Sequence, residues 1–165
     1  VRRQRQMCIR DSVSTYYGRR YVLVWNYIFK RFAFYRFDRI KEVCKSNECT
    51  NKNEMMMRAD TAVQKLWGVS FGKENYTEKL EMTVRIAKGE EYILKRLERE
   101  KRNGTIQKLA NGDYKFMTEV YDASEMVPWI KTFTGRIVEI KCSNERVEKQ
   151  IKEDFEMMKR IYEVR

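Results

Sequence analysis

The sequence predicts an α+β fold, and two patterns support this prediction. The segment after Gly18 is β-prone, because Tyr, Phe, Val and Ile dominate RRYVLVWNYIFKRFAFYRFDRIKEV. The second half instead alternates strand-like segments, with a period of two residues, and helix-like segments, with spacings of three and four. At 165 residues and 42% hydrophobic content, the chain can hold one ordinary domain or two small ones.

Two strands are expected within residues 19–43, joined near residues 26–31. The second strand is expected to run through FYRFDRIKEV, residues 34–43, because aromatic residues and Ile alternate there with charged residues. If Tyr35 and Phe37 face the core, Arg39 lies on the same side at its rim. On such a strand one face would carry Phe34, Arg36, Asp38 and Ile40, and the other would carry Tyr35, Phe37 and Arg39.

The segment that follows is polar and predicts a surface loop over residues 44–54, since Ser, Asn and Thr cluster there. A short helix is expected from Ala62 to Trp67, and Gly68 would end it.

The second half predicts a regular order of elements. A strand is expected in residues 78–86, a helix in 89–101, and a hairpin in 104–123 around Asn111-Gly112. A second helix is expected in residues 124–135, with Ser124 or Asp122 as its cap, followed by a strand in 136–143 and an amphipathic helix in 144–164. This β-α-β-β-α-β order predicts a ferredoxin-like domain over residues 78–165 that ends in an additional helix.

Positive charge is concentrated near the start of the chain. Residues 1–43 carry eleven Lys and Arg against three Asp and Glu. Any basic partner surface is therefore expected in the first quarter. Part of this excess lies in VRRQRQMCIRDS, residues 1–12, which resembles a peptide translated from sequencing-adapter DNA. We interpret residues 1–12 as a non-native leader outside the fold.

The composition excludes several classes of chemistry. Without histidine, Ser-His-Asp and Cys-His catalysis and HExxH zinc sites are unavailable. The four cysteines form no CxxC pair, so we expect reduced thiols, no metal, no cofactor and no enzymatic activity. No apolar run is long enough to span a bilayer, and no signal-peptide core is present. We therefore expect a soluble, cytoplasmic protein without membrane partners.

Several motifs resemble the WYL-domain transcriptional regulators. Arg20-Tyr21-Val22 stands where the family has Trp-Tyr-Leu, and Arg36-Phe37-Asp38-Arg39-Ile40 is similar to its Arg-x-Asp-Arg-Ile strand. Leu66-Trp67-Gly68-Val69 resembles the linker of these regulators. The segment from Trp129-Ile130 through Thr134-Gly135 to Val138 resembles their C-terminal extension. The resemblance covers residues 13–165.

The resemblance implies an architecture. Residues 13–50 would form the C-terminal part of an Sm-like WYL barrel, residues 51–77 a linker with a short helix, and residues 78–165 the ferredoxin-like extension. Such regulators bind DNA through an N-terminal helix-turn-helix, which we expect to be missing from this fragment, and they form homodimers.

The resemblance also implies a ligand. WYL domains use a basic pocket near this strand to sense a nucleic-acid fragment or a nucleotide-like molecule, and Arg36 and Arg39 occupy the matching positions. Arg20 and Arg31 would extend this basic patch, and Tyr21 could stack on bases. The expected partner is single-stranded nucleic acid or a nucleotide.

Other interpretations remain open at this point. Asp38 and Arg39 could form a structural ion pair, while the other basic residues could be charged strand edges that prevent aggregation. Arg136 is a weaker candidate that could reach the pocket of a neighbouring subunit. The chain could also be a dimerisation domain without a ligand. A metal-dependent enzyme would require a compact acidic cluster, which the sequence does not offer.

Overall fold

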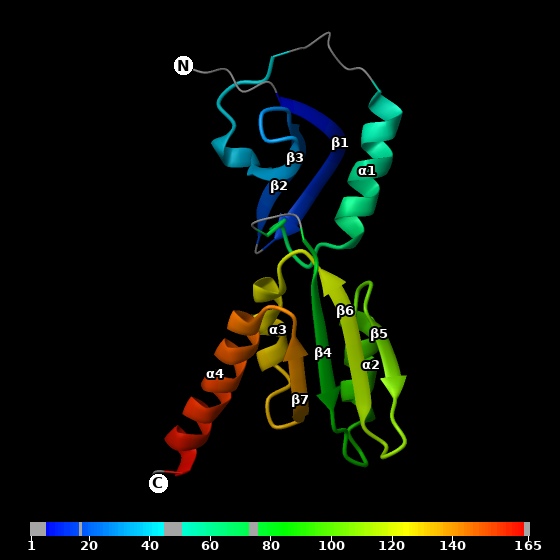
Figure 1. The fold of residues 1–165 in the computed structure, drawn as a ribbon, viewed down its shortest axis with the longest axis vertical. Helices are drawn as coiled ribbons and strands as arrows, with labels where there is room; N and C mark the ends of the chain where they lie inside the picture. The colour runs from blue at the N-terminus through cyan, green and yellow to red at the C-terminus, as the bar shows by residue number, and fades with distance from the viewer. Residues whose placement is uncertain (1–5, 17, 45–50, 73–75, 164–165) are drawn as a thin grey trace. The chain divides into compact units, whose positions relative to one another are not determined.

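The computed structural model describes residues 6–16, 18–44, 51–72 and 76–163. The chain divides into two compact units, Val1–Asn75 and Tyr76–Arg165, which we call the N-terminal and C-terminal units. Together their described residues form two antiparallel sheets and four α-helices, so the predicted α+β class is confirmed (Figure 1). Neither sheet closes into a barrel.

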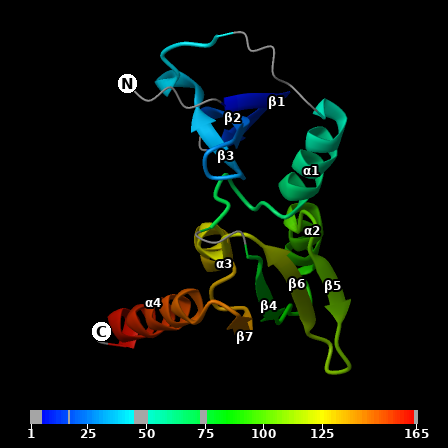
Figure 2. The same cartoon turned by 45° about the horizontal axis from the view of Figure 1, so that its top comes forward.

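The sheet of the N-terminal unit contains β1 (Gln6–Tyr16), β2 (Arg19–Asn26) and β3 (Arg31–Arg36), in that order (Figure 2). Both strand pairs are antiparallel. The predicted connection near residues 26–31 is confirmed, because Asn26 pairs with Arg31 at the end of the ladder. Residues 6–12, which we assigned to a leader, lie in β1, while residues 1–5 fall outside the described residues. The non-native origin of this segment stays a prediction.

The predicted strand over residues 34–43 is wrong in its second half. β3 ends at Arg36, and Phe37–Arg39 form a 3-10 turn that is closed by a hydrogen bond from Ile40 N to Phe37 O at 3.3 Å. Asp is a poor strand residue that favours turns, and here the Asp38 carboxylate accepts hydrogen bonds from Arg36 two residues earlier. Phe37 consequently does not face the core and is 50% exposed.

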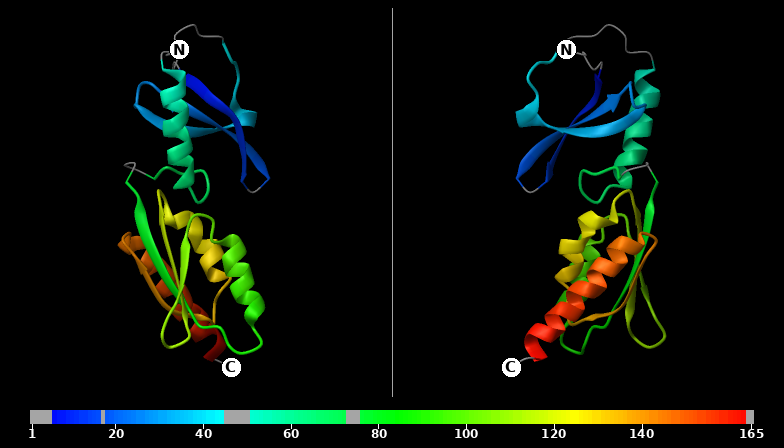
Figure 3. Two further views of the ribbon diagram at one scale, coloured as in Figure 1. Left: turned by 90° about the vertical axis from the view of Figure 1, so that its right-hand side faces the viewer. Right: turned by 60° about the vertical axis from the view of Figure 1, so that its left-hand side comes forward.

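The helix of the N-terminal unit is longer and earlier than predicted. α1 spans Lys52–Gln64 rather than residues 62–67, so it takes up the end of the predicted loop, whose residues 45–50 lie outside the described ranges. The run of Met, Arg and Ala favours a helix, and Met55, Ala59 and Ala62 are buried at spacings of four and three. α1 lies beside β1 (Figure 3).

The C-terminal unit follows the predicted order. Its elements are β4 (Glu78–Val84), α2 (Glu91–Glu100), β5 (Thr105–Lys108), β6 (Tyr114–Val120), α3 (Val127–Lys131), β7 (Ile137–Cys142) and α4 (Glu145–Glu163). The strands form one antiparallel sheet in the order β5-β6-β4-β7. A 3-10 turn at Ala123–Met126 precedes α3, and its predicted cap is present, because Asp122 accepts a hydrogen bond from Ser124 N at 3.0 Å.

One face of this sheet forms the core with the helices. Phe116 packs closely against the backbone of Gly104, because a Cβ atom at Gly104 would lie 2.3 Å from Cε2 of Phe116. The fully buried side chains of this core come from the strands β4 and β6 and from the segments of α2, α3 and α4. They include Leu80, Met82, Val84, Leu97, Phe116, Met126, Ile130, Phe133 and Ile151.

Candidate functional site

The five predicted site residues lie on the β2–β3 hairpin, but they do not share one face. Tyr21 is directly opposite Arg36 in the ladder, so these two share a face. Arg20 and Arg31 belong to the opposite face by alternation, and Arg39 lies in the 3-10 turn after β3. Five residues separate Arg31 from Arg36, which is about 16 Å along a strand. Arg31 therefore lies at the turn end of the hairpin, and the other four residues lie at its open end.

The guanidinium of Arg36 is held by Asp38. Nε donates to Oδ1 at 3.1 Å and Nη2 donates to Oδ2 at 2.5 Å, a bidentate pair. The hydrogen bond from Arg36 lowers the pKa of Asp38, and the same bond raises the pKa of Arg36. The structural ion pair considered for Asp38 thus exists, with Arg36 rather than Arg39 as its partner. An external anion at Arg36 would have to compete with this carboxylate.

Tyr21 is half-buried in an aromatic cluster. Its ring meets Phe34 edge-on, with 6.5 Å between centroids, and Phe34 stacks on Phe71 at 5.8 Å. Phe71 follows α1 and is buried against this face of the sheet. Tyr21 therefore contributes to packing, and its ring is less available to a base than the sequence pattern suggests.

Arg20 lies over Phe37 at the open end of the hairpin. Its Cζ atom is 5.2 Å from the centroid of the ring, the geometry of a cation–π contact. Arg20 is exposed, and so is Arg39 in the same 3-10 turn. Because the strand ends at Arg36, Phe37 leaves the sheet and meets Arg20 instead of the core. The alternating pattern of residues 34–43 could not reveal this contact.

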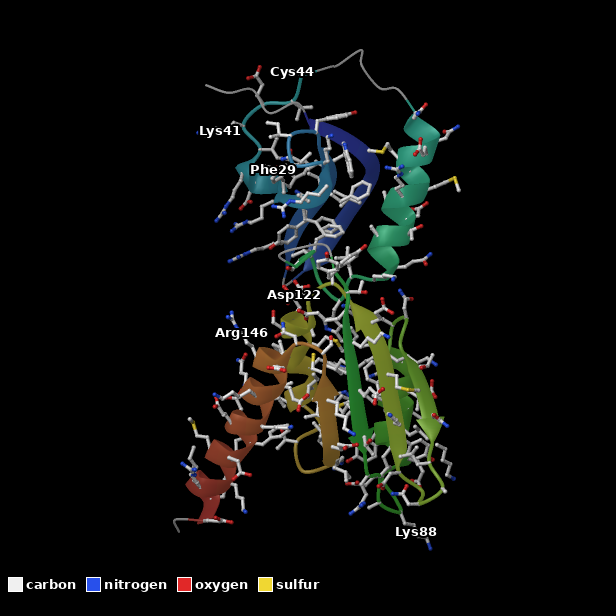
Figure 4. The ribbon with its side chains drawn as sticks, in the orientation of Figure 1. Phe29, Lys41, Cys44, Lys88, Asp122 and Arg146 are labelled. Carbon is white, nitrogen blue, oxygen red and sulfur yellow. The ribbon has the colours of Figure 1, made fainter. Side chains whose placement is uncertain are left out.

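A second contact of the same kind lies at the β2–β3 turn. The Cζ atom of Arg31 is 5.6 Å from the ring centroid of Phe29, which is 59% exposed (Figure 4). The neighbouring Tyr27 and Ile28 are 41% and 57% exposed. Exposed large apolar residues in succession are uncommon on a monomer and mark interaction surfaces.

Asn26 shapes this turn. Its side-chain Oδ1 accepts hydrogen bonds from Ile28 N at 3.0 Å and Phe29 N at 3.1 Å, while Nδ2 donates to the hydroxyl of Tyr35 at 3.3 Å. Asn26 is only 3% exposed, so the turn is anchored in the unit by a buried polar side chain. Sequence reasoning missed Asn26, although an Asn at the end of a β-prone run before a turn is a recognisable signal.

The charge around the hairpin is of one sign. No acidic residue occurs between Asp11 and Asp38, and this segment contains five basic residues, namely Arg19, Arg20, Lys30, Arg31 and Arg36. Such a stretch attracts polyanions over distances of about a Debye length.

The C-terminal unit does not extend this basic surface. Arg136, the weaker candidate, donates to Glu90 through Nε at 3.2 Å and Nη2 at 2.6 Å. On the sheet face away from the core, Lys115 pairs with Glu81 at 2.6 Å, and Lys141 pairs with Glu139 at 2.7 Å. Each of these three basic side chains is paired with a carboxylate of the same unit.

Catalytic or metal chemistry finds no support in the described part of the chain. Within the ranges that the structure covers, no group of three or more Cys, Asp or Glu side chains is arranged to hold a metal ion. Cys142 is buried, and burial raises the pKa of its thiol, which disfavours the reactive thiolate. None of the described helices combines the length and the apolar character required to cross a membrane.

The C-terminal unit has one further surface feature. A groove of about 370 Å³ is lined by Thr134, Gly135, Ile137, Phe155, Met158, Lys159 and Tyr162, between the α3–β7 connection and the distal half of α4. Beside it, Ile161 and Tyr162 are 63% and 74% exposed.

Comparison with known proteins leaves the family open. Neither the protein-family models nor the curated proteins that were compared with this chain give a match.

Proposed function

We propose that this chain is a ligand-sensing regulatory module of the WYL type, which binds single-stranded nucleic acid or a nucleotide-like anion through the β2–β3 hairpin. The observation that carries the proposal is the hairpin itself, which presents five basic residues and no acidic one between Asp11 and Asp38. Two of its arginines lie against exposed Phe rings, and Arg–aromatic pairs suit nucleotides because one ligand offers both phosphates and base faces.

The architecture is consistent with this proposal. The strand order β5-β6-β4-β7, with α2 and α3 as the crossovers, supports a ferredoxin-like extension in the C-terminal unit. The open three-stranded sheet of the N-terminal unit supports part of an Sm-like barrel. In a homodimeric regulator, ligand binding at the hairpin would act by stabilising one arrangement of the modules over another.

The test is fluorescence anisotropy of the full chain with a short labelled single-stranded oligonucleotide at two salt concentrations. We expect saturable binding that weakens with salt, because each phosphate contact adds about 0.7 to the salt slope for single strands. Arg39→Ala removes an exposed cation of the proposed site and should weaken binding and reduce the slope.

Lys88→Ala is the matched control, since it removes one exposed positive charge from the turn between β4 and α2 (Figure 4). It should bind as the wild type does. Absence of binding by the well-folded wild-type chain would refute the proposed function, while equal binding by Arg39→Ala would remove Arg39 from the site.

A second candidate function is a dimerisation domain without a ligand. The exposed apolar residues in the distal half of α4 favour it. The apolar side chains of this helix flank the groove, and Met157, Ile161 and Tyr162 are all more than 60% exposed. A second copy of the chain could bury them.

Ile161→Glu should then yield monomers in sedimentation equilibrium, whereas Gln150→Glu, which adds the same charge at an exposed polar position of α4, should leave a dimer. A wild-type monomer at all concentrations would contradict this candidate. Dimer stability that ignores oligonucleotides would favour it over the sensor.

A further inference from the structure

We infer that the two Arg–Phe contacts of the hairpin are stacking platforms for the two ends of one single-stranded oligonucleotide, and that the ligand is a strand of about six nucleotides or more rather than a mononucleotide. This inference rests on the proposed function and specifies its ligand. The platforms are Phe29 with Arg31 at the β2–β3 turn, and Phe37 with Arg20 at the open end.

Each platform offers both parts of a nucleotide site. Phe29 and Phe37 are 59% and 50% exposed, so each ring retains accessible surface beside its arginine. A base can stack on such a ring, and the neighbouring guanidinium can donate to a phosphate oxygen of the same nucleotide. The contact with the ring also restricts the long arginine side chain before binding, which lowers the entropy cost of ordering it on the ligand.

The strand register places the two arginines on the same face of the hairpin. Asn26 is opposite Arg31, and Val22 is opposite Tyr35. Alternation along β2 therefore puts Arg20 on the face that carries Arg31. A single strand that follows this side of the hairpin can reach both arginines.

The spacing sets the length of the ligand. Six residues separate Arg31 from Phe37, which corresponds to about 20 Å along a strand. Stacked nucleotides advance by about 3.4 Å each along one strand, so about six of them span this distance. A mononucleotide can engage only one platform at a time, whereas a longer strand gains from the high effective concentration of the second.

The turn platform is preorganised. The side chain of Asn26 fixes the backbone of residues 28 and 29 through two hydrogen bonds, and Lys30 adopts a left-handed φ of 48° that completes the turn. Because these hydrogen bonds fix the backbone of the turn, Phe29 stays 59% exposed in it. Apart from Arg36, which pairs with Asp38, the hairpin carries four basic residues and no acidic one, and this charge favours a polyanion as the occupant.

The experiment is an anisotropy titration of the full chain with labelled oligo-dT of two, four, six, eight and twelve nucleotides. We expect the affinity of the wild type to rise up to about six nucleotides and then to level off. Phe29→Leu and Phe37→Leu keep an apolar residue but remove the ring, and each should weaken binding of the eight-nucleotide probe by about 5- to 150-fold. Each should also remove the length dependence, because one platform is left.

Ile28→Ala is the matched control, since it lies in the same turn, is 57% exposed and has no ring. It should bind as the wild type does. The three residues are exposed, so folding should be preserved, which circular dichroism can check.

Four outcomes would overturn the inference. If the wild type binds probes of two and eight nucleotides with equal affinity, one strand does not bridge the two platforms. If both Leu variants bind with wild-type affinity, the Phe rings are not stacking platforms. In either case, binding that depends on Arg39 would leave the proposed function standing. Failure of the wild type to bind any probe would refute the proposed function as well. Loss of binding to phosphatidylserine vesicles in the Leu variants, without oligonucleotide binding by the wild type, would assign the turn to a membrane surface.

Discussion

The two units differ in net charge and in the exposure of the Phe rings that their arginines contact. Residues 1–75 carry sixteen basic and seven acidic residues, whereas residues 76–165 carry nineteen and seventeen. In the C-terminal unit arginines are held by carboxylates, as Arg136 is by Glu90 and Arg96 is by Glu100. The hairpin of the N-terminal unit has one such pair, Arg36 with Asp38, but places two further arginines on exposed Phe rings. In the C-terminal unit, Arg96 lies over Phe133, which is only 1% exposed. The excess of positive charge in the N-terminal unit supports the proposed binding of an anion there.

Phenylalanine gives the largest expected difference between the units. Phe116 is fully buried in the C-terminal core, so Phe116→Ala should lower the free energy of unfolding of that unit by about 3–5 kcal/mol. Phe37→Ala in the N-terminal unit should change stability by about 0.5 kcal/mol or less, because the ring is half exposed. Denaturant titration combined with hydrogen exchange distinguishes the units. Comparable losses for the two variants would contradict the contrast.

Asn26 tests whether the binding turn is preorganised. Asn26→Ala removes two hydrogen bonds to the turn backbone and should lower the stability of the N-terminal unit by about 1–2 kcal/mol. It should also weaken oligonucleotide binding, because Phe29 loses its fixed position. Tyr35→Phe is the control, since it removes the hydroxyl contacted by Asn26 but leaves both backbone bonds in place. If Asn26→Ala binds normally, preorganisation of the turn is not required.

Glu100 provides an effect in the C-terminal unit that depends on pH. Burial raises the pKa of Glu100, but hydrogen bonds from Arg96, Trp129 and Arg99 outweigh it, so the pKa lies below the ordinary value of 4.5. The unfolded state therefore binds this proton more readily. The resulting stabilisation is present above pH 4.5 and is lost as the pH falls through the lower pKa of the folded state.

Glu100→Gln should accordingly cost about 1–2 kcal/mol at neutral pH. The difference from the wild type should shrink on acidification below pH 4.5, where the wild-type carboxylate becomes protonated. Denaturant midpoints measured between pH 7 and pH 3 would show this convergence. A difference that does not depend on pH would mean that shape, rather than charge, makes Glu100 important.

Local patterns were sufficient for most of the C-terminal unit. The strand at Glu78–Val84 and the hairpin at Asn111-Gly112 were predicted because alternation and turn residues act over a few positions. The same reasoning failed at Asp38, where alternation continued in the sequence although the strand had ended. Alternation describes side-chain types only. The strand ends at Arg36 because residues 37–39 form a 3-10 turn, in which Asp38 pairs with Arg36.

The five proposed site residues stay a prediction, and Arg36 and Arg39 among them were chosen from the resemblance to WYL domains. The basic residues of the hairpin could be recognised from composition, since charge and β-propensity are properties of single residues. Their division between two ends of the hairpin, and the roles of Phe29 and Phe37, could not be recognised in this way. They depend on the register of β2 and β3, which is set by the turn at Asn26.

The sequence by itself therefore determined the α+β class, the order of elements in the C-terminal unit and the concentration of positive charge in the first quarter. Only the tertiary structure decided that Arg136 pairs with Glu90 and that Arg20 lies over the exposed ring of Phe37. The physical reason is the distance along the chain over which each effect acts. Propensity and periodicity act within a few residues, whereas an arginine chooses among all the carboxylates and rings that the folded backbone brings within its reach.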